Sequence, residues 1–238
     1  MLQNNFIALV VTFILAVIWL RINDFAAHRG WISSDISRKL IHIGTGPLFV
    51  LCWLLFDDSP SARFLAALIP LAITMQFLLV GLGVIRDEAA VKAMARSGDR
   101  REILRGPLFY GIVFVLLTII YWKNSLIGIT ALMLLCGGDG LADIIGRRFG
   151  RLALPWNSQK TWAGSMGMIL GGWLFAALIP VAYLAAGEIS GVFSAFLPAL
   201  TIIALAGAAV ESLPTGDYDN LTVPLAALLL GHLLLPTV

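Results

Sequence analysis

The chain of 238 residues has few of the side chains from which soluble proteins build their surfaces. Only 13% of its residues are charged, and it has two cysteines and three histidines. So few charged residues cannot cover the surface of a water-soluble domain of this length. The two cysteines, Cys52 and Cys136, both lie in apolar stretches, which excludes a disulfide framework and a zinc-binding cysteine pattern.

The common nucleotide-binding signatures of soluble proteins are also missing. The chain has no GxxxxGK[ST] motif, because Gln159 and not glycine precedes Lys160, and no GxGxxG motif lies between a strand and a helix. Any nucleotide must therefore bind in a site unlike those of the soluble P-loop and dinucleotide-binding folds.

Apolar residues are what the chain has in abundance, at 59% of the sequence. A bilayer-spanning helix needs roughly 17–25 such residues. Eight stretches qualify, of which the first and last are short and the fifth is interrupted by glycines and acids: 6–20, 40–56, 63–84, 107–122, 126–146, 163–186, 192–210 and 221–236. The sequence predicts an all-α, polytopic membrane protein of about eight helices, within a range of seven to nine, that forms one domain over residues 1–238.

The basic residues are strongly segregated along the chain. Three inter-helix stretches hold nearly all of them: Arg21, Arg29, Arg38 and Lys39; then Arg86, Lys92, Arg96, Arg100, Arg101 and Arg105; then Arg147, Arg148, Arg151 and Lys160. By the positive-inside rule these stretches face the cytoplasm and both termini lie on the opposite side. The first apolar run has no basic residue before it and Arg21 after it, which predicts an uncleaved anchor.

The polar clusters of the chain all fall on this predicted cytoplasmic side. They occupy residues 37–42, 98–107, 137–161 and 211–220. Four such loops at one face can converge on a single pocket, whereas a transporter more often has polar groups from paired broken helices near the midplane. The pattern favours a one-sided membrane enzyme over a transporter, which remains the less favoured alternative.

The most unusual segment is 137–150, which places two aspartates and two arginines at the end of an apolar run. Asp139 and Asp143 are four residues apart and so share one helix face. An acid at such a depth is costly unless it meets water, a cation or a partner, and two carboxylates suit Mg²⁺. The alternative is structural: the aspartates can cap a helix end and pair with Arg147 or Arg148.

The following loop has the composition of a phosphate-binding loop. Arg147, Arg148 and Arg151 can bind phosphate oxygens as a fork. Lys160 and Thr161 come next to the start of the following helix, where free N–H groups favour anions. The alternative for the arginines is simple anchoring at the lipid headgroups.

At these residues the chain resembles the polyprenol kinase family, which includes phytol, farnesol and dolichol kinases. The matching pieces run in family order: Arg38-Lys39 with His42; Gly106-Pro107-Leu108-Phe109-Tyr110-Gly111; Gly138-Asp139-Gly140 with Ala142-Asp143; Gly146-Arg147-Arg148-Phe149-Gly150; Lys160-Thr161-Trp162-Ala163-Gly164-Ser165; and Glu211 with Asp219-Asn220-Leu221-Thr222-Val223-Pro224. Segment 97–111 and the short chain resemble the phytol kinase branch.

The resemblance implies a kinase that transfers the γ-phosphoryl group of CTP to a membrane prenyl alcohol, with Mg²⁺ as cofactor and phytol as the favoured acceptor. The string from Asp139 to Lys160 is also similar to CDP-diacylglycerol synthases, so a CTP-using cytidylyltransferase is the alternative. The expected partners are CTP, a prenyl alcohol and membrane lipids, with no nucleic acid and with protein partners left open.

The roles implied by this resemblance fall into four sets. The catalytic residues are Asp139, Asp143 and Lys160, and the metal ligands are Asp139 and Asp143. The nucleotide-binding residues are Arg147, Arg148, Asn157, Lys160 and Ser165. The alcohol-side residues are Lys39, His42, Glu211, Asp219 and Asn220. The base that receives the hydroxyl proton is left open among Asp139, His42, Glu211 and Asp219.

Overall fold

The computed structural model describes residues 4–95 and 98–236, and almost all of its regular structure is helical. The α-helices are α1 (Asn5–His28), α2 (Ser34–Cys52), α3 (Ala62–Leu82), α4 (Glu88–Met94), α5 (Gly106–Tyr121), α6 (Leu126–Met133), α7 (Asp139–Phe149), α8 (Trp162–Ala185), α9 (Phe193–Glu211) and α10 (Asp219–Leu234). Short helical turns are η1 (Trp53–Leu55), η2 (Arg100–Leu104), η3 (Leu134–Gly138) and η4 (Gly216–Tyr218). The strands β1 (Ala153–Leu154) and β2 (Asn157–Thr161) form an antiparallel hairpin.

The predicted all-α membrane architecture is confirmed. Within the described residues, seven segments are long and apolar enough to cross a bilayer: 5–28, 35–55, 62–82, 100–121, 126–149, 162–185 and 193–211. The predicted eighth segment, 221–236, corresponds to α10, which has 16 residues and packs against α5, α6 and α9. Helices α1 and α2 extend toward their connecting loop beyond the predicted 6–20 and 40–56.

Local sequence signals set several helix ends. The side chain of Asn4 accepts hydrogen bonds from the first N–H groups of α1, and the Thr161 hydroxyl accepts one from Gly164 at the start of α8. Both are N-caps, which satisfy donors that the helix itself leaves free. Helix α3 ends at Gly83 with φ +79°, a left-handed conformation that glycine adopts without steric cost.

A central helix runs through the middle of the bundle and is made of α6, η3 and α7. In an apolar 18-residue stretch of this central helix 78% of the residues are buried, against 11–44% in the matching stretches of the other six candidate spans. Residues 126–138 are all buried. A helix that is apolar all round belongs in a protein core, and here the core helix carries its acids only where it emerges at one end.

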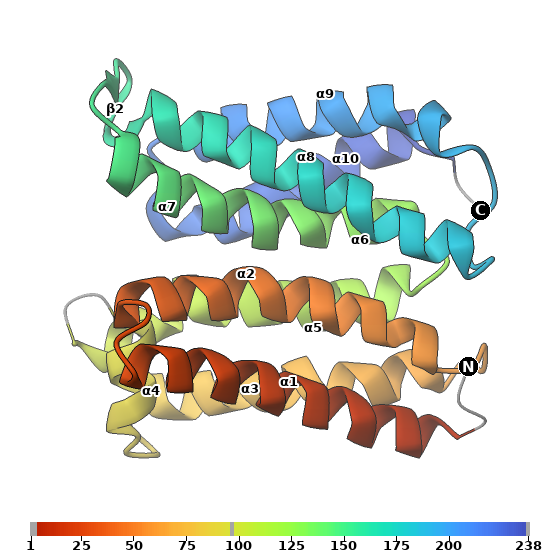
Figure 1. Cartoon of the computed structure of the whole chain (residues 1–238), viewed down its shortest axis with the longest axis horizontal. Coiled ribbons are helices and arrows are strands. Elements are labelled where there is room, and N and C mark those ends of the chain that lie inside the picture. The colour runs from red at the N-terminus through yellow and green to blue at the C-terminus, as the bar shows by residue number, and fades with distance from the viewer. Residues whose placement is uncertain (1–3, 96–97, 237–238) are drawn as a thin grey trace.

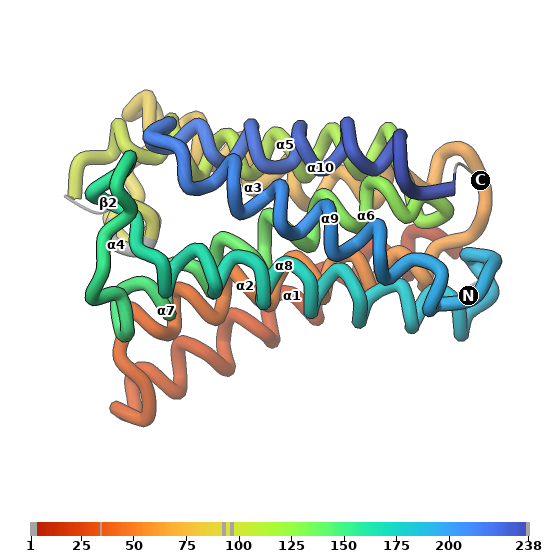
Figure 2. Tube along the Cα trace, turned by 90° about the horizontal axis from the view of Figure 1, so that it is seen from above, coloured from red at the N-terminus to blue at the C-terminus, as the bar shows by residue number. Residues whose placement is uncertain are grey.

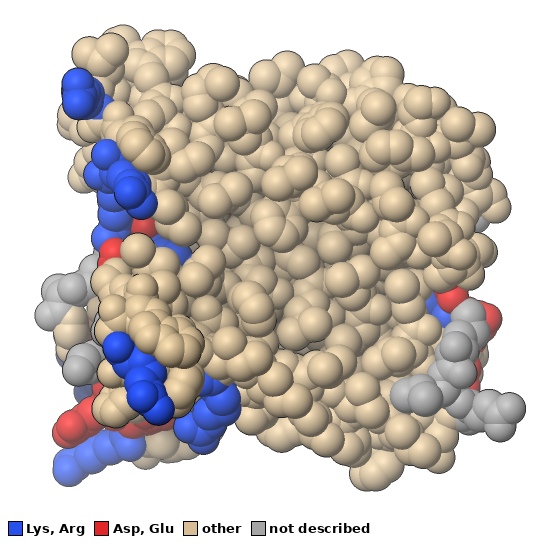
Figure 3. All heavy atoms as spheres, viewed as in Figure 1, with Lys and Arg blue, Asp and Glu red and all other residues tan. Residues whose placement is uncertain are grey.

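The two ends of the bundle differ sharply in charge. Figure 1 shows that the connections from α1 to α2, α3 to α5, α7 to α8 and α9 to α10 share one end, at the left. The start of α1 and the end of α10 lie at the other. Figure 3 shows lysines, arginines and acids gathered at the left, with an uncharged belt over the middle. We call the left end the charged end. The predicted one-sided clustering is confirmed, while its cytoplasmic orientation stays a prediction. Arg96 lies outside the described residues.

The opposite end has one buried charge that the sequence did not single out. Lys123, whose side chain is 2% exposed, lies 2.9 Å from both Asp58 and Glu188 and donates to the carbonyl of Phe56. These contacts join three loops. The opposite end is therefore not wholly apolar, although the larger polar clusters lie at the charged end.

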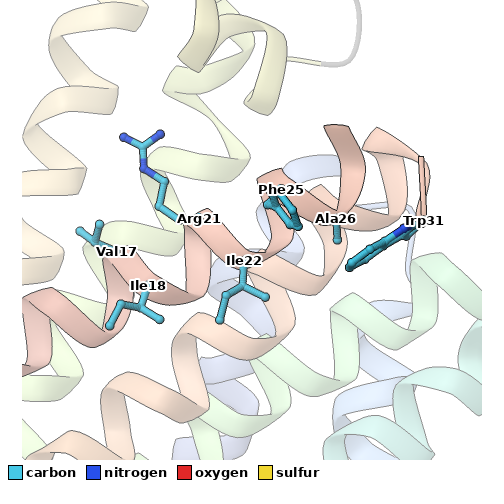
Figure 4. A pocket seen from close by; sticks show the side chains of 7 residues that line it. All are labelled: Val17, Ile18, Arg21, Ile22, Phe25, Ala26 and Trp31. Carbon is cyan, nitrogen blue, oxygen red and sulfur yellow. The ribbon is translucent and has the colours of Figure 1, made fainter. Parts of the chain in front are cut away.

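A shallow apolar depression lies along α1 and is separate from the polar clusters of the charged end. Its lining includes Ile18, Ile22 and Phe25 of α1 together with Trp31, whose ring meets Phe25 edge-on. Figure 4 shows these side chains and the guanidinium of Arg21, which points away from Trp31. No predicted site residue lines this depression.

Candidate active site

The site begins with a distortion of the central helix. Between α6 and α7 the turn η3 is π-helical and contains Gly137 and Gly138. Such turns often mark functional positions within helices. Helix α8 lies so close here that a Cβ at Gly171 would lie 2.2 Å from the Gly137 carbonyl oxygen. Gly167 and Gly171 thus form a helix-packing surface against α7 and the turn that leads into Asp139.

Three carboxylates from three elements meet at the charged end. Asp139 begins α7, Glu211 ends α9 and Asp219 begins α10, and one ligand oxygen of each lies within 4.8 Å of the other two. Figure 2 shows that α9 and α10 connect at the end where β2 lies. We call these residues the acidic cluster.

Lys160 neutralises part of the acidic cluster. Its Nζ forms an ion pair with Glu211 and lies 3.2 Å from Oδ2 of Asp219. Burial alone would lower the pKa of Lys160, but the Glu211 and Asp219 carboxylates outweigh it and raise that pKa above its usual value. Lys160 therefore remains an ammonium at neutral pH.

The residues of the cluster fit a divalent cation. They offer carboxylate oxygens, which are the ligands that Mg²⁺ prefers. The Glu211 side chain is only 4% exposed, and its Oε2 is buried with no hydrogen-bond partner among residues 4–95 and 98–236. A buried, unpartnered carboxylate oxygen is costly unless something charged or polar reaches it. The metal prediction for Asp139 thus gains Glu211 and Asp219 as candidate co-ligands.

His42 borders the acidic cluster on the side of α2. Its Nε2 lies 3.5 Å from Oδ2 of Asp139, and its ring packs on Tyr110 with centroids 4.5 Å apart. The Tyr110 hydroxyl in turn lies 3.2 Å from the sulfur of Cys136. The pair thus links Asp139 of the acidic cluster to the buried Cys136 of the central helix.

Asp143 belongs to a neighbouring network of charges. Its carboxylate lies 3.0 Å from Nζ of Lys39 and 2.9 Å from Nε of Arg147. Arg147 also reaches Asp35 at 3.3 Å, and Asp35 pairs with Arg38. The structure thus contains the i,i+4 pair that the structural alternative expected, and the metal role of Asp143 stays a prediction.

The hairpin that carries Lys160 is pinned to the end of α9. The amide of Asn157 donates to the carbonyls of Ser212 and Leu213, at 3.1 and 3.2 Å. The indole of Trp156 donates to the Ser212 hydroxyl at 3.2 Å. These bonds from the Asn157 amide position β2. The predicted contact of Asn157 with the nucleotide stays a prediction.

Two other predicted nucleotide ligands lie apart from these contacts. Arg148 is exposed, and its guanidinium stacks over the ring of Phe149. Ser165 is in the first turn of α8, and its Oγ is buried with no hydrogen-bond partner within the described part of the chain. Neither residue takes part in the acidic cluster.

Residues 106–111 lie beside two residues that are expected to bind the alcohol, Asn220 and His42. A Cβ at Gly106, the first residue of α5, would lie 3.3 Å from Nδ2 of Asn220. Phe109 stacks on Tyr218 with ring centroids 5.5 Å apart. Helix α5 therefore borders the loop before α10 as well as His42 on α2.

Sequence reasoning missed two side chains of this region. Tyr110 lies inside a quoted motif but was not assigned a role, although it packs directly on His42. Asp35 pairs with Arg38 and, across 112 residues of sequence, with Arg147. Its only sequence signal is its position three residues before Arg38, which is too common to single out.

Known proteins were compared with the chain as a whole. It is 43% identical over 213 residues to a probable chloroplastic phytol kinase of Triticum aestivum, covering 89% of this chain and 71% of that protein. It is 44% identical over 211 residues to a chloroplastic farnesol kinase of Arabidopsis thaliana, covering 87% and 67%. A probable phytol kinase 3 of Glycine max is 41% identical over 236 residues, covering 98% and 74%.

No family model and no solved structure matches the chain. The similarity to these relatives extends over most of each sequence. The chain belongs to the polyprenol kinase family.

Proposed function

We propose that this member of the polyprenol kinase family is a CTP-dependent prenol kinase with phytol as its favoured acceptor. The observation that carries the proposal is the acidic cluster with Lys160, which lies at one end of an apolar bundle. Phosphoryl transfer mainly requires positioning and charge neutralisation. A site at the membrane boundary can hold a charged nucleotide while the acceptor's apolar chain stays among the helices. The relatives named as phytol and farnesol kinases support the class of acceptor.

In this proposal Asp139, Glu211 and Asp219 hold Mg²⁺, with Asp143 as the further ligand that the sequence predicted. When bound, the ion would neutralise charge on the triphosphate. Glu211 contributes the oxygen that has no hydrogen-bond partner in the described structure. Asp139 and Asp219 approach it from the central helix and from α10.

The triphosphate is assigned to the basic residues around the hairpin. Arg147 and Arg148 follow Asp143 in the last turn of α7, and Lys160 stands before α8. Arginine binds phosphate oxygens as a planar fork, whereas lysine acts as a mobile point charge. Asn157 and Ser165 remain lesser candidates, the first because its amide already holds the hairpin.

The hydroxyl of the alcohol is assigned to the wall formed by α2, α5 and α10. Lys39, His42 and Asn220 lie on this side of the acidic cluster. In the reaction the alcohol oxygen bonds to the γ-phosphorus while the bond from phosphorus to the β,γ-bridging oxygen breaks, and CDP leaves. The hydroxyl proton passes to a base of the cluster or to His42.

The decisive experiment uses purified full-length protein, γ-labelled CTP and a panel of phytol, geranylgeraniol, farnesol and a dolichol. We expect label in phytyl phosphate and release of CDP. In a cytidylyltransferase the acceptor would instead attack the α-phosphorus of CTP, so that labelled pyrophosphate leaves and the lipid carries the cytidine. In a parallel assay with γ-labelled ATP, transfer of label from ATP but not from CTP would refute CTP as the phosphoryl donor and leave the kinase reaction itself supported.

A further inference from the structure

A second basic feature lies at the charged end, formed by the end of α3 and the turn η2. It is a notch lined by Gly81, Leu82, Arg100, Arg101, Leu104 and Arg105. All three of its arginines are exposed. None of these six residues belongs to the acidic cluster or to the proposed nucleotide ligands. We call this feature the arginine notch.

Two glycines allow the arginine notch to form. A Cβ at Gly83, where α3 ends, would lie 1.4 Å from Nη1 of Arg100, so this guanidinium rests on the glycine backbone. A Cβ at Gly81 would lie 2.5 Å from a methyl carbon of Leu104. On the other side the Asp99 carboxylate accepts the N–H of Arg101 at 2.9 Å and caps η2. The turn η2 and the end of α3 thus hold these arginines in place.

The residues beside the arginine notch are strongly apolar and exposed. Leu82 is 57% exposed, Val84 70% and Ile85 44%. Leu82 is the last residue of a candidate membrane span and Val84 and Ile85 come just after it, so all three lie where the bilayer meets the charged end. A free anion would need only the guanidinium groups. A phosphate joined to acyl chains would use the guanidinium groups and the apolar side chains together.

We propose that the arginine notch binds the phosphate of an anionic phospholipid at this boundary of the membrane. Guanidinium groups recognise phosphate oxygens with charge-assisted hydrogen bonds. Clustered arginines beside a membrane helix attract anionic headgroups. The bound lipid would hold η2, which leads through Arg105 into α5 and its Gly106, next to Asn220.

The test measures lipid binding to the purified full-length protein in detergent by native mass spectrometry, with phosphatidylglycerol and phosphatidylcholine as probes. We expect wild type to retain phosphatidylglycerol about tenfold more strongly than phosphatidylcholine. The double variant Arg100→Gln/Arg105→Gln should lose most of this preference. The matched double variant Arg21→Gln/Arg29→Gln removes the same charge from the α1 end and should keep it.

A second comparison leaves the net charge unchanged. Gly83→Ala places a methyl group where the Arg100 guanidinium lies, so it should weaken phosphatidylglycerol retention. Gly187→Ala meets a similar φ of +75°, has nothing within 4 Å of the added Cβ and lies at the opposite end. It should carry the same backbone strain without changing lipid preference. If Gly83→Ala fails to fold, the arginine variants still decide the question.

Two results would overturn the proposal. Equal loss in the Arg21/Arg29 double variant would show that net charge alone attracts the lipid. Displacement of phosphatidylglycerol by millimolar inorganic phosphate, with the retention of phosphatidylcholine unchanged, would show a site for free anions. Neither result would bear on the kinase proposal, because the experiment measures no turnover.

Discussion

Nζ of Lys160 lies 3.2 Å from Oδ2 of Asp219, although 59 residues separate them in the sequence. The same ammonium pairs with Glu211, so one cation from the hairpin lies against carboxylates of α9 and α10. A cation entering the acidic cluster would share these carboxylates with Lys160. Because a lysine stem is long and flexible, Lys160 can then turn toward a phosphate.

The acidic cluster predicts which carboxylates bind metal. Glu211→Gln and Asp139→Asn should each weaken Mn²⁺ binding by at least about tenfold, since even supporting residues of metal sites have effects of that size. Isothermal titration of the purified protein measures this directly. Asp143→Asn is the comparison variant and should weaken binding less, because the Asp143 carboxylate also pairs with Lys39 and Arg147. If Asp143→Asn lost binding and Glu211→Gln kept it, the ligand set would be the pair Asp139 and Asp143.

Turnover should depend strongly on the charges around the cluster. Asp139→Asn should lower kcat by about 10²–10³, the usual effect of removing one preorganised charge-stabilising group. EDTA should abolish turnover and Mg²⁺ should restore it. Lys160→Met should lower both kcat and CTP affinity, with partial rescue by Lys160→Arg. Wild-type affinity for CTP in Lys160→Met would remove Lys160 from the nucleotide site.

The opposite end of the bundle predicts a purely structural effect. Lys123→Met leaves the largely buried Glu188 without its cation and should cost about 1–3 kcal/mol, the penalty for an unsatisfied buried polar group. The double variant Lys123→Met/Glu188→Gln should recover part of that loss, because the stranded charge is gone. Thermal unfolding in detergent measures both. Kinase activity per folded molecule should not change, and a drop in it would link this end to the site.

Because α8 packs closely on η3, the effect of replacing a glycine of α8 by alanine should depend on which glycine is replaced. Gly171→Ala would place a methyl group 2.2 Å from the backbone oxygen of Gly137, so it should cost about 1–3 kcal/mol and displace Asp139. A Cβ at the neighbouring Gly172 would have the side chain of Leu134 as its nearest neighbour, at 3.2 Å, so Gly172→Ala should cost less. Comparing melting temperature and kcat for the two variants tests this. Equal effects would contradict the close contact.

The orientation of the bundle is open to cysteine labelling. In a background without Cys52 and Cys136, a cysteine at Ser158 should react with a membrane-impermeant maleimide only from the cytoplasmic face. A cysteine at Gly187 should react only from the other face. The positive-inside rule supplies the direction. Reaction of both residues from one face would contradict the placement of the hairpin and the α8–α9 loop at opposite ends (Figure 1).

The sequence alone determined the architecture and the polar end. Long apolar runs can satisfy their backbone groups in a bilayer only as helices, so the spans could be placed within a few residues, apart from the extended α1 and α2. The segregation of arginine and lysine placed the polar loops at one end. Asp139 stood out because an acid at the end of a membrane-grade run is costly without a partner.

The tertiary structure decided which partners those acids have. Spacing on one helix paired Asp139 with Asp143, but the fold surrounds Asp139 with Glu211, Asp219 and His42. It also adds Lys39 of α2 to the local pair that Asp143 forms with Arg147. Contacts between residues on different helices depend on how the helices pack. That packing is set by close approaches such as Gly171 on Gly137. The periodicity of one helix does not predict distances between residues on different helices. The sequence therefore identified the charged residues, and only the packed bundle determined which of them lie together.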